Sequence, residues 1–279
     1  RILIGKDTRQ SGDMLEAALT AGLCSVGADV ESLGVVPTPA VAYLVRKYNA
    51  DAGVVISASH NPMEFNGIKI FAGTGYKLPD DVEEEIEAHI DDKCAGIPLA
   101  TGDGVGRVTC RIDGIKDYVE HLYESIGGDL SGLNVCIDCA NGASAEVAQQ
   151  LFPRLGAKCT FLGVSPDGRN INAGVGSTHL DNLEKAVVEG GFDCGIAFDG
   201  DADRCLACDE KGQELDGDKI IALLAMAMKD KGRLDGNTAV VTVMSNLGFV
   251  KYMESQGINT EKTAVGDRYV LENMRENGY

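Results

Sequence analysis

The sequence is short of basic residues for its length. Lys and Arg number 25 against 43 Asp and Glu, which gives a formal net charge of -18. Nucleic acids and anionic membranes are bound by clusters of Lys and Arg, so this balance argues against both kinds of partner. A phosphorylated small molecule stays compatible, because a few cations and backbone amides at helix starts can hold phosphate in an acidic protein.

Long apolar runs and prolines are also scarce. No run approaches the roughly 18 residues that span a bilayer, and the chain opens on a strand pattern at Arg1 without a charged and then apolar leader. We therefore expect a soluble, cytoplasmic protein. With 279 residues, 44% of them apolar, the chain can bury a large core in two or three domains. Its 35 glycines against 7 prolines favour many tight turns over disorder.

Several motifs of well-known enzyme classes are missing. There is no G-x-x-x-x-G-K-[ST], and no G-x-G-x-x-G follows a strand pattern, so ATP or dinucleotide binding has no support. There is no G-x-S-x-G elbow of the kind that carries a hydrolase serine.

Cysteine, in contrast, is plentiful. Two of the nine cysteines form the pair "CIDC" at 136–139 and two form "CLAC" at 205–208, a spacing that could supply a four-thiolate zinc site. Both pairs lie in apolar strand patterns, where residues i and i+3 point to opposite faces. We interpret them as small core residues of a protein in a reducing compartment.

Strand and helix patterns alternate along the chain. Short apolar runs such as "AGVVIS" are followed by segments with helical spacing such as "TPAVAYLVRKY". This predicts an α/β fold of consecutive similar domains, with mixed, mostly parallel sheets covered by helices on both faces. "VVISASHNP", "VCIDCANGAS" and "VVTVMSNLG" each lead a strand into a polar turn, as copies of one unit would. We expect domains at 1–112, 113–212 and 213–279, the third incomplete.

The strongest chemical signal is "FDGDADR" at 198–204. Asp199, Asp201 and Asp203 alternate just after a strand, where α/β folds place ligands. Three carboxylates this close repel one another unless a cation lies among them, and hard oxygen ligands suit Mg²⁺. Arg204 beside them can bind a phosphate.

Two other interpretations of these aspartates remain. A calcium loop, D-x-D-x-D-G-x5-E, would use the three aspartates and Glu210, but its glycine position holds Arg204 and a strand precedes it. A solvated acidic turn without metal is also compatible, because Asp and Gly are common in turns.

A second polar loop follows the strand at 54–56. Ser59 would be well placed beside Mg²⁺ to accept and return a phosphoryl group. His60 and Asn61 supply polar contacts, and Lys69 in "NGIKI" could neutralise phosphate or move a proton. A serine by itself is more often a turn or cap residue.

The loop "GKDTRQSG" at 5–12 offers the cations Lys6 and Arg9 and glycines that let the backbone approach an anion. It is also compatible with a plain strand-to-helix turn. For His179 in "GSTH" and Cys139 in "DCANG" we expect structural roles.

"GKDTR", "SASHNP", "NGIKI" and "DGDADR", in this order, resemble the α-phosphohexomutase family, and the resemblance extends over nearly all 279 residues. It implies that Ser59 is a phosphoserine and that Asp199, Asp201 and Asp203 hold Mg²⁺ together with the serine phosphate. It also implies two phosphoryl transfers, from the phosphoserine to a phosphosugar and back from a sugar bisphosphate. His60 and Lys69 would take part in catalysis, and Arg9, Asn61 and Arg204 would bind substrate or phosphate.

Within the family, "NINAGVGSTHLDNL" and "VGDRYVLENM" resemble members that interconvert glucosamine 6-phosphate and glucosamine 1-phosphate on the route to UDP-N-acetylglucosamine. Members that act on mannose or glucose phosphates are the alternative. The family's opening Gly- and Arg-containing segment, its G-E-x-S-G-H loop and its R-x-S-G-T loop do not occur here. We therefore expect a fragment with impaired turnover, or a non-catalytic one that keeps the fold and metal loop. A Mg²⁺-dependent phosphatase and a homodimer also stay open.

Overall fold

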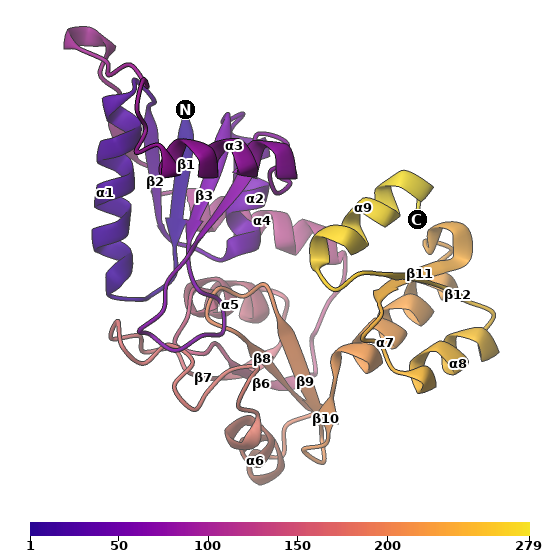
Figure 1. Cartoon of the computed structure of the whole chain (residues 1–279). Helices are drawn as coiled ribbons and strands as arrows, with labels where there is room; N and C mark the ends of the chain where they lie inside the picture. The colour runs from indigo at the N-terminus through magenta and orange to yellow at the C-terminus, as the bar shows by residue number, and fades with distance from the viewer. The chain divides into compact units, whose positions relative to one another are not determined.

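The computed structural model describes all 279 residues, which divide into two compact units, Arg1–Gln213 and Glu214–Tyr279. The first unit contains two sheets, each accompanied by its own helices (Figure 1). The first sheet has the strand order β4-β3-β1-β2-β5, and only β4 runs antiparallel to its neighbour. Its elements are β1 (Ile2–Lys6), α1 (Ser11–Ser25), β2 (Val30–Val35), α2 (Thr38–Lys47), β3 (Ala52–Ile56), β4 (Ile68–Ala72), α3 (Asp80–Asp91) and β5 (Val108–Cys110).

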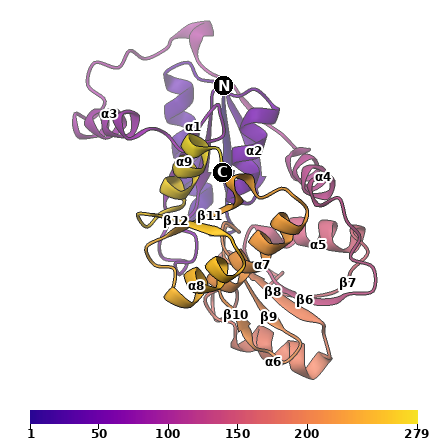
Figure 2. The ribbon, with the colours of Figure 1, turned by 90° about the vertical axis from the view of Figure 1, so that its right-hand side faces the viewer.

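Helices cover both faces of this sheet because successive strand residues point to opposite sides. Leu3 and Val55 face α2, where Val41 and Leu44 complete a core without exposed surface. Ile4 and Val54 belong to a second core, which the α1 side chains at 15, 19 and 23 close. Figure 2 shows α1 and α2 on opposite sides of the strands.

The second sheet repeats this arrangement with the strand order β9-β8-β6-β7. Only β9 runs antiparallel to its neighbour among these four strands. Helix α5 closes the core on the face of Val135 and Ile137, and α6 closes the face of Cys136. The elements are α4 (Gly114–Ile126), β6 (Asn134–Asp138), α5 (Ser144–Arg154), β7 (Lys158–Leu162), α6 (Asp181–Gly190), β8 (Cys194–Phe198) and β9 (Cys205–Asp209). The two-residue strand β10 (Glu214–Leu215) opens the second unit.

A shared core joins the two sheets' layers within the first unit. Tyr118 and Val119 of α4 and Leu151 of α5 are buried in the same cluster as Leu44 of α2. The loops at the ends of the two sheets are therefore held together by packed helices rather than by a flexible linker.

The second unit is smaller and has one parallel pair of strands. Its buried core combines Val241 of β11, Met253 of α8 and Ile258. The elements are α7 (Gly217–Asp230), β11 (Thr238–Thr242), α8 (Leu247–Ser255), β12 (Asn259–Thr263) and α9 (Asp267–Asn277), with short 3-10 turns at Asp235–Asn237 here and at Gly102–Gly104 in the first unit.

The α/β class and the sheets covered on both faces are confirmed. The apolar pattern did not predict β2, β5 and β12. Glu31 and Ser32 interrupt the apolar run of β2, and the sequence "NTEKT" of β12 is almost entirely polar. Short strands of this kind do not show a clear apolar pattern in the sequence. Across the whole chain, the helices are too short or too polar to cross a bilayer.

Candidate active site

Ser59 lies in the turn that follows β3, with its hydroxyl directed at the acidic loop after β8. Its Oγ donates to Asp199 Oδ2 at 2.6 Å and lies 3.4 Å from Asp203 Oδ1. The residue is 8% exposed and has a left-handed backbone with φ of 53°. A side chain with a Cβ adopts this region at a cost of about 1–2 kcal/mol, so the surrounding contacts must hold it. Ser57 contributes one such contact, because its Oγ accepts from Ser59 N at 2.9 Å.

The three predicted metal ligands are brought together by the tight turn after β8. One ligand oxygen from each of Asp199, Asp201 and Asp203 lies within 4.8 Å of the others. Asp199 and Asp201 are fully buried, and the Oδ1 atom of Asp201 is buried without a hydrogen-bond partner. Clustered carboxylates with one unsatisfied buried oxygen fit a divalent cation that prefers oxygen ligands.

The calcium-loop interpretation is not compatible with this geometry. Its twelfth position, Glu210, follows the five-residue strand β9, whose start lies next to the aspartates. A strand of this length carries the chain about 15 Å away, so Glu210 cannot share an ion with Asp199.

Lys69 reaches the acidic cluster from β4. This strand pairs with β3 in the antiparallel direction, and Lys69 lies opposite Val55. Its Nζ contacts Asp201 Oδ2 at 2.6 Å and Asp203 Oδ2 at 2.8 Å. The β3–β4 hairpin therefore delivers both Ser59 and Lys69 to the same carboxylates.

The pKa values in this cluster are displaced from their usual ranges. Burial, with the neighbouring Asp201 and Asp203, raises the pKa of Asp199 to about 6. Burial opposes ionisation of Asp201 as well, but the Lys69 ammonium lowers the pKa of that carboxyl. Burial disfavours the charged form of Lys69, yet the two carboxylates raise its pKa, so Lys69 is a cation at neutral pH.

His60, Asn61 and Arg204 surround this centre. Burial and the Arg204 charge lower the pKa of His60, so its ring is neutral at pH 7. Arg204 is half exposed, with its Nε 3.9 Å from Asp203 Oδ1, and is free to meet an anion. His60 and Asn61 line a hollow of about 480 Å³ together with Arg169 and His179. His179, for which a structural role was expected, thus faces the same hollow as His60.

The structure places Arg9 differently from the sequence prediction. Its side chain is fully buried and is paired with Asp7, whose Oδ2 accepts from Nε at 2.9 Å. The remaining four N–H groups are directed at backbone oxygens of Ser59, Asn61, Pro62 and Phe65. A guanidinium has five N–H donors, so Arg9 has none left for a phosphate and instead supports the Ser59 loop from below.

Three residues of this site were not predicted. Thr38, the first residue of α2, donates from Oγ1 to Asp201 Oδ2 at 2.5 Å. Asn172 donates to backbone oxygens of the Ser59 loop. Gly200 lets the acidic loop approach, because a Cβ there would lie 2.7 Å from Ser59 O. The one available signal for Asn172 was the long connection at 163–180, since connections of this length are often functional.

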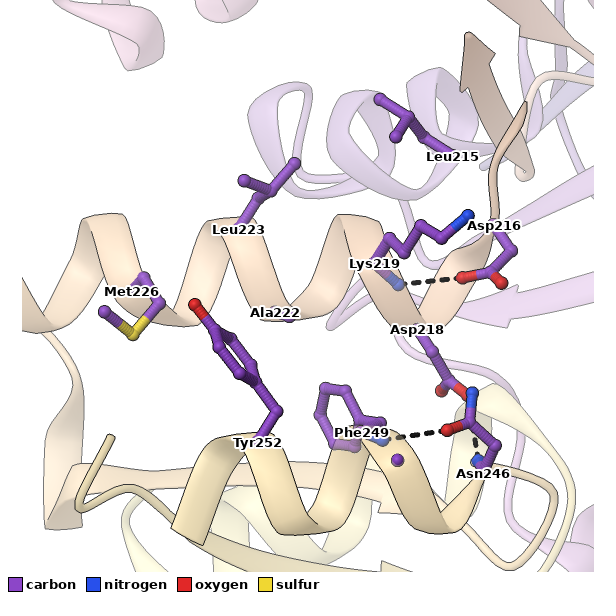
Figure 3. Close-up of a pocket in the computed structure, with 11 residues that line it drawn as sticks. Leu215, Asp216, Asp218, Lys219, Ala222, Leu223, Met226, Asn246, Phe249 and Tyr252 are labelled. Carbon is purple, nitrogen blue, oxygen red and sulfur yellow. Dashed lines mark hydrogen bonds between the residues drawn. The ribbon is translucent and has the colours of Figure 1, made fainter. Parts of the chain in front are cut away.

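The second unit has a pocket of its own, which holds none of the predicted site residues. It measures about 450 Å³ and lies between α7 and α8 (Figure 3). Leu223 and Met226 of α7 and Phe249 and Tyr252 of α8 make its walls apolar. It offers no cluster of carboxylates or cations comparable to that around Ser59.

Comparison with known proteins gives the same family along the whole chain. Models of the phosphoglucomutase/phosphomannomutase alpha/beta/alpha domains I, II and III match residues 1–95, 116–212 and 216–279, respectively. The phosphoglucosamine mutase of Acetivibrio thermocellus is 58% identical over 279 residues, and that of Clostridium tetani is 55% identical. Each alignment covers 100% of this chain and 62% of the relative.

Solved structures agree in fold. A phosphoglucomutase/phosphomannomutase family protein from Burkholderia thailandensis superimposes with a TM-score of 0.84 at 26% identity, covering 99% of this chain and 60% of that one. The chain thus spans about three fifths of the length of its relatives, and it belongs to the phosphoglucomutase/phosphomannomutase family.

Proposed function

We propose that the protein to which this chain belongs is a phosphosugar mutase with Ser59 as the phosphoryl carrier. It interconverts glucosamine 6-phosphate and glucosamine 1-phosphate through a sugar bisphosphate. The contact that carries this proposal is the 2.6 Å hydrogen bond from Ser59 Oγ to Asp199 Oδ2. It joins a nucleophile in one domain to a cluster of carboxylates in another.

The chain's own residues account for two reversible transfers. When Ser59 Oγ forms its bond to phosphorus, Asp199 Oδ2 takes the proton of the hydroxyl, the bond from phosphorus to the sugar oxygen breaks, and the sugar oxygen takes a proton from the Lys69 ammonium. In the opposite direction the sugar hydroxyl bonds to the phosphorus of the phosphoserine and returns its proton to Lys69, the Oγ–P bond breaks, and Ser59 Oγ regains the proton held by Asp199. Lys69 and Arg204 neutralise charge on the transferring group, and the neutral ring of His60 supplies a polar contact beside it.

We propose Mg²⁺ as the cation that Asp199, Asp201 and Asp203 hold together with Ser59. The unsatisfied Oδ1 of Asp201 and the all-oxygen donor set support this choice. When bound, such a cation stabilises the negative charge that spreads over a transferring phosphoryl group.

The preference for glucosamine phosphates rests on the relatives of 55–58% identity that carry the name phosphoglucosamine mutase. Mannose or glucose phosphates are the alternative substrates within the family. We also propose domains at 1–112, 113–212 and 213–279, which places Ser59 in the first domain and the carboxylates in the second. A cytoplasmic location stays a prediction from the cysteine pattern, and a homodimer stays open.

The test is the intact mass of the chain before and after incubation with Mg²⁺ and glucosamine 1,6-bisphosphate. The proposal expects a gain of one phosphoryl group that tandem mass spectrometry assigns to Ser59. Release of inorganic phosphate without isomerised sugar phosphate would favour a phosphatase. No gain, with the same result for a chain extended to the length of its relatives, would contradict the proposal.

A further inference from the structure

The backbone of the Ser59 loop is held from two domains at the same two atoms. Arg9, three residues beyond β1, donates through Nη2 to Ser59 O at 2.9 Å and to Asn61 O at 2.8 Å. Asn172, in the 163–180 connection of the second sheet, donates through Nδ2 to the same oxygens at 2.9 and 3.2 Å. A carbonyl oxygen has two lone pairs, so both acceptors are fully used.

We propose that Arg9 and Asn172 form a clamp that positions Ser59 for phosphoryl transfer. The nucleophile would be aligned only when the 163–180 connection of the second sheet is docked on the loop. Both are positioning residues, because they contact the backbone of the loop and not the reacting oxygen. The inference rests on the proposed function for the role of Ser59, while the clamp itself concerns the geometry of the loop.

The loop needs such support because its backbone is unfavourable in isolation. Ser59 is left-handed, and its carbonyl oxygen is turned into the protein, where an unpaired acceptor is costly. Ser57 holds the amide side of the residue, and its own hydroxyl donates to Asp7 at 2.6 Å. Asp7 in turn pairs with Arg9, so a single buried network fixes both sides of Ser59.

Asn172 is itself fixed in a way that suits this role. It is 6% exposed and left-handed, and its backbone N–H donates to Ala140 O at 2.9 Å. Its Oδ1 is buried without a partner, so the hydrogen bonds of its side chain run through the amide nitrogen to the Ser59 loop. A Cβ on Gly200 would lie 2.8 Å from this nitrogen, which shows how closely the acidic loop packs on the clamp.

Three substitutions and a matched control isolate the contacts of the clamp. Asn172→Ala removes both donors, and Asn172→Asp places a carboxylate oxygen against two carbonyl oxygens. Asn182→Ala is the control, because Asn182 also donates from Nδ2 to a loop carbonyl, Gly174 O at 2.9 Å, but does not reach the Ser59 loop. Arg9→Lys keeps a cation for Asp7 but offers three donors in place of five.

Three measurements are made on each variant. Hydrogen exchange by mass spectrometry follows the peptide 57–67, mass spectrometry follows phosphorylation by glucosamine 1,6-bisphosphate, and calorimetry gives the Mg²⁺ affinity. For Asn172→Ala we expect exchange in 57–67 to rise about tenfold, in proportion to the lost restraint. The maximal phosphorylation rate should fall about 100-fold while the half-saturating bisphosphate concentration changes little. Mg²⁺ affinity should stay within about twofold, since no carboxylate is altered. The rise in exchange should be larger for Asn172→Asp than for Asn172→Ala. Arg9→Lys should also raise exchange in the peptide 57–67.

The outcomes separate the clamp from the proposed function. Exchange in 57–67 that matches the Asn182→Ala control would overturn the clamp, whatever phosphorylation does. Exchange that rises equally along the whole chain, with lost Mg²⁺ binding, would also overturn it, because Asn172 would then serve stability alone. Exchange that responds as expected, with no phosphoryl uptake by this chain or by a chain extended to the length of its relatives, would support the clamp and count against the proposed function.

Discussion

The two sheets of the first unit have the same strand order but carry different chemistry. In both, the central strand is flanked by two parallel neighbours, β2 and β3 around β1, and β7 and β8 around β6. In both, the third strand turns back into an antiparallel partner, β4 or β9. The turn after β3 holds Ser59, and the turn after β8 holds the three aspartates. Equivalent turns of two similar sheets thus provide the proposed nucleophile and the carboxylates.

Neither the Ser59 turn nor the acidic turn forms the site by itself. The Ser59 turn has no carboxylate of its own beside the hydroxyl, and Ser59 Oγ finds its acceptor in Asp199. Asp201 of the acidic turn accepts hydrogen bonds from Lys69 of β4 and Thr38 of α2. Each loop satisfies polar groups of the other, so assembly of the site and packing of the two domains are coupled.

The largest expected effect comes from removing the proposed phosphoryl carrier. Ser59→Ala should abolish phosphoryl uptake, a loss of at least about 10³-fold, while the carboxylates still bind Mg²⁺. Phosphorylation by intact mass and Mg²⁺ binding by calorimetry test the two halves separately. An unchanged rate of phosphoryl uptake would show that the carrier is another residue.

A change in the acidic turn should instead affect Mg²⁺ binding directly. Asp201→Asn removes a ligand charge from the second sheet's turn and should weaken Mg²⁺ binding by at least the about 10- to 100-fold that loss of a ligand's supporting partner costs. The fold should persist, because Thr38 and Lys69 contact a surface of the loop that the amide still fills. Calorimetry with circular dichroism as the folding control measures this, and unaltered Mg²⁺ affinity would count against the metal assignment.

Separating the two turns without touching a reactive group sharpens the comparison further. A Cβ on Gly200 would lie 2.7 Å from both Ser59 O and the Ile171 side chain, so Gly200→Ala should lower the free energy of unfolding by about 1–3 kcal/mol. It should also slow phosphorylation. Gly22→Ala is the control, because a Cβ in that helix meets nothing within 4 Å. Equal urea denaturation of the two variants would show that the turns do not pack closely.

The smallest effect concerns a feature that only the first sheet has. Its edge strand β5 is followed by Arg111, whose Nη2 and Nε contact Glu31 at 2.9 and 3.2 Å. Arg111 lowers the pKa of Glu31 below its usual 4.5. The contribution of the ionised Glu31 to the free energy of unfolding is therefore fully present above pH 4.5. It is lost as the pH falls through the lower pKa that Glu31 has in the folded state. Glu31→Gln should lower the free energy of unfolding by about 1 kcal/mol at pH 7 and should not change it in strong acid.

Urea denaturation across this pH range checks the sign. Glu120→Gln serves as the control, because Glu120 pairs with Arg154 at 2.8 Å on an exposed surface and should matter less. If the difference in free energy of unfolding between the unsubstituted chain and Glu31→Gln grows toward acid pH, the stabilising role of the Glu31–Arg111 pair is contradicted.

Much of this architecture could be predicted from the sequence, because buried parallel strands and amphipathic helices leave clear patterns. The cluster of carboxylates was predicted for a similar reason, since Asp199, Asp201 and Asp203 lie close together in the sequence. The equivalence of the repeats was predicted wrongly. "VVISASHNP" contains β3, whose counterpart in the second sheet is β8, whereas "VCIDCANGAS" contains β6, the counterpart of β1. Strand patterns alone do not reveal the position of a strand in a sheet.

The supporting residues could not be predicted, because their roles depend on contacts between distant segments. Arg9 carries a charge beside glycines, which suits phosphate binding, but only the fold shows that its donors are all used by the Ser59 loop and Asp7. Asn172 lies far along the chain from Ser59, and its side chain is unremarkable for a polar loop. The length of the 163–180 connection was the one signal, and it does not identify the segment that Asn172 contacts.

The most direct test of the central claim is whether a phosphoryl group on Ser59 and a cation in the acidic cluster meet. Mn²⁺ prefers the same oxygen ligands as Mg²⁺ and is paramagnetic. Pulsed electron–nuclear double resonance on the Mn²⁺-loaded chain, after treatment with glucosamine 1,6-bisphosphate, should show a ³¹P coupling of a directly coordinated phosphate that Ser59→Ala lacks. Mn²⁺ bound by the aspartates without any such coupling would contradict the account.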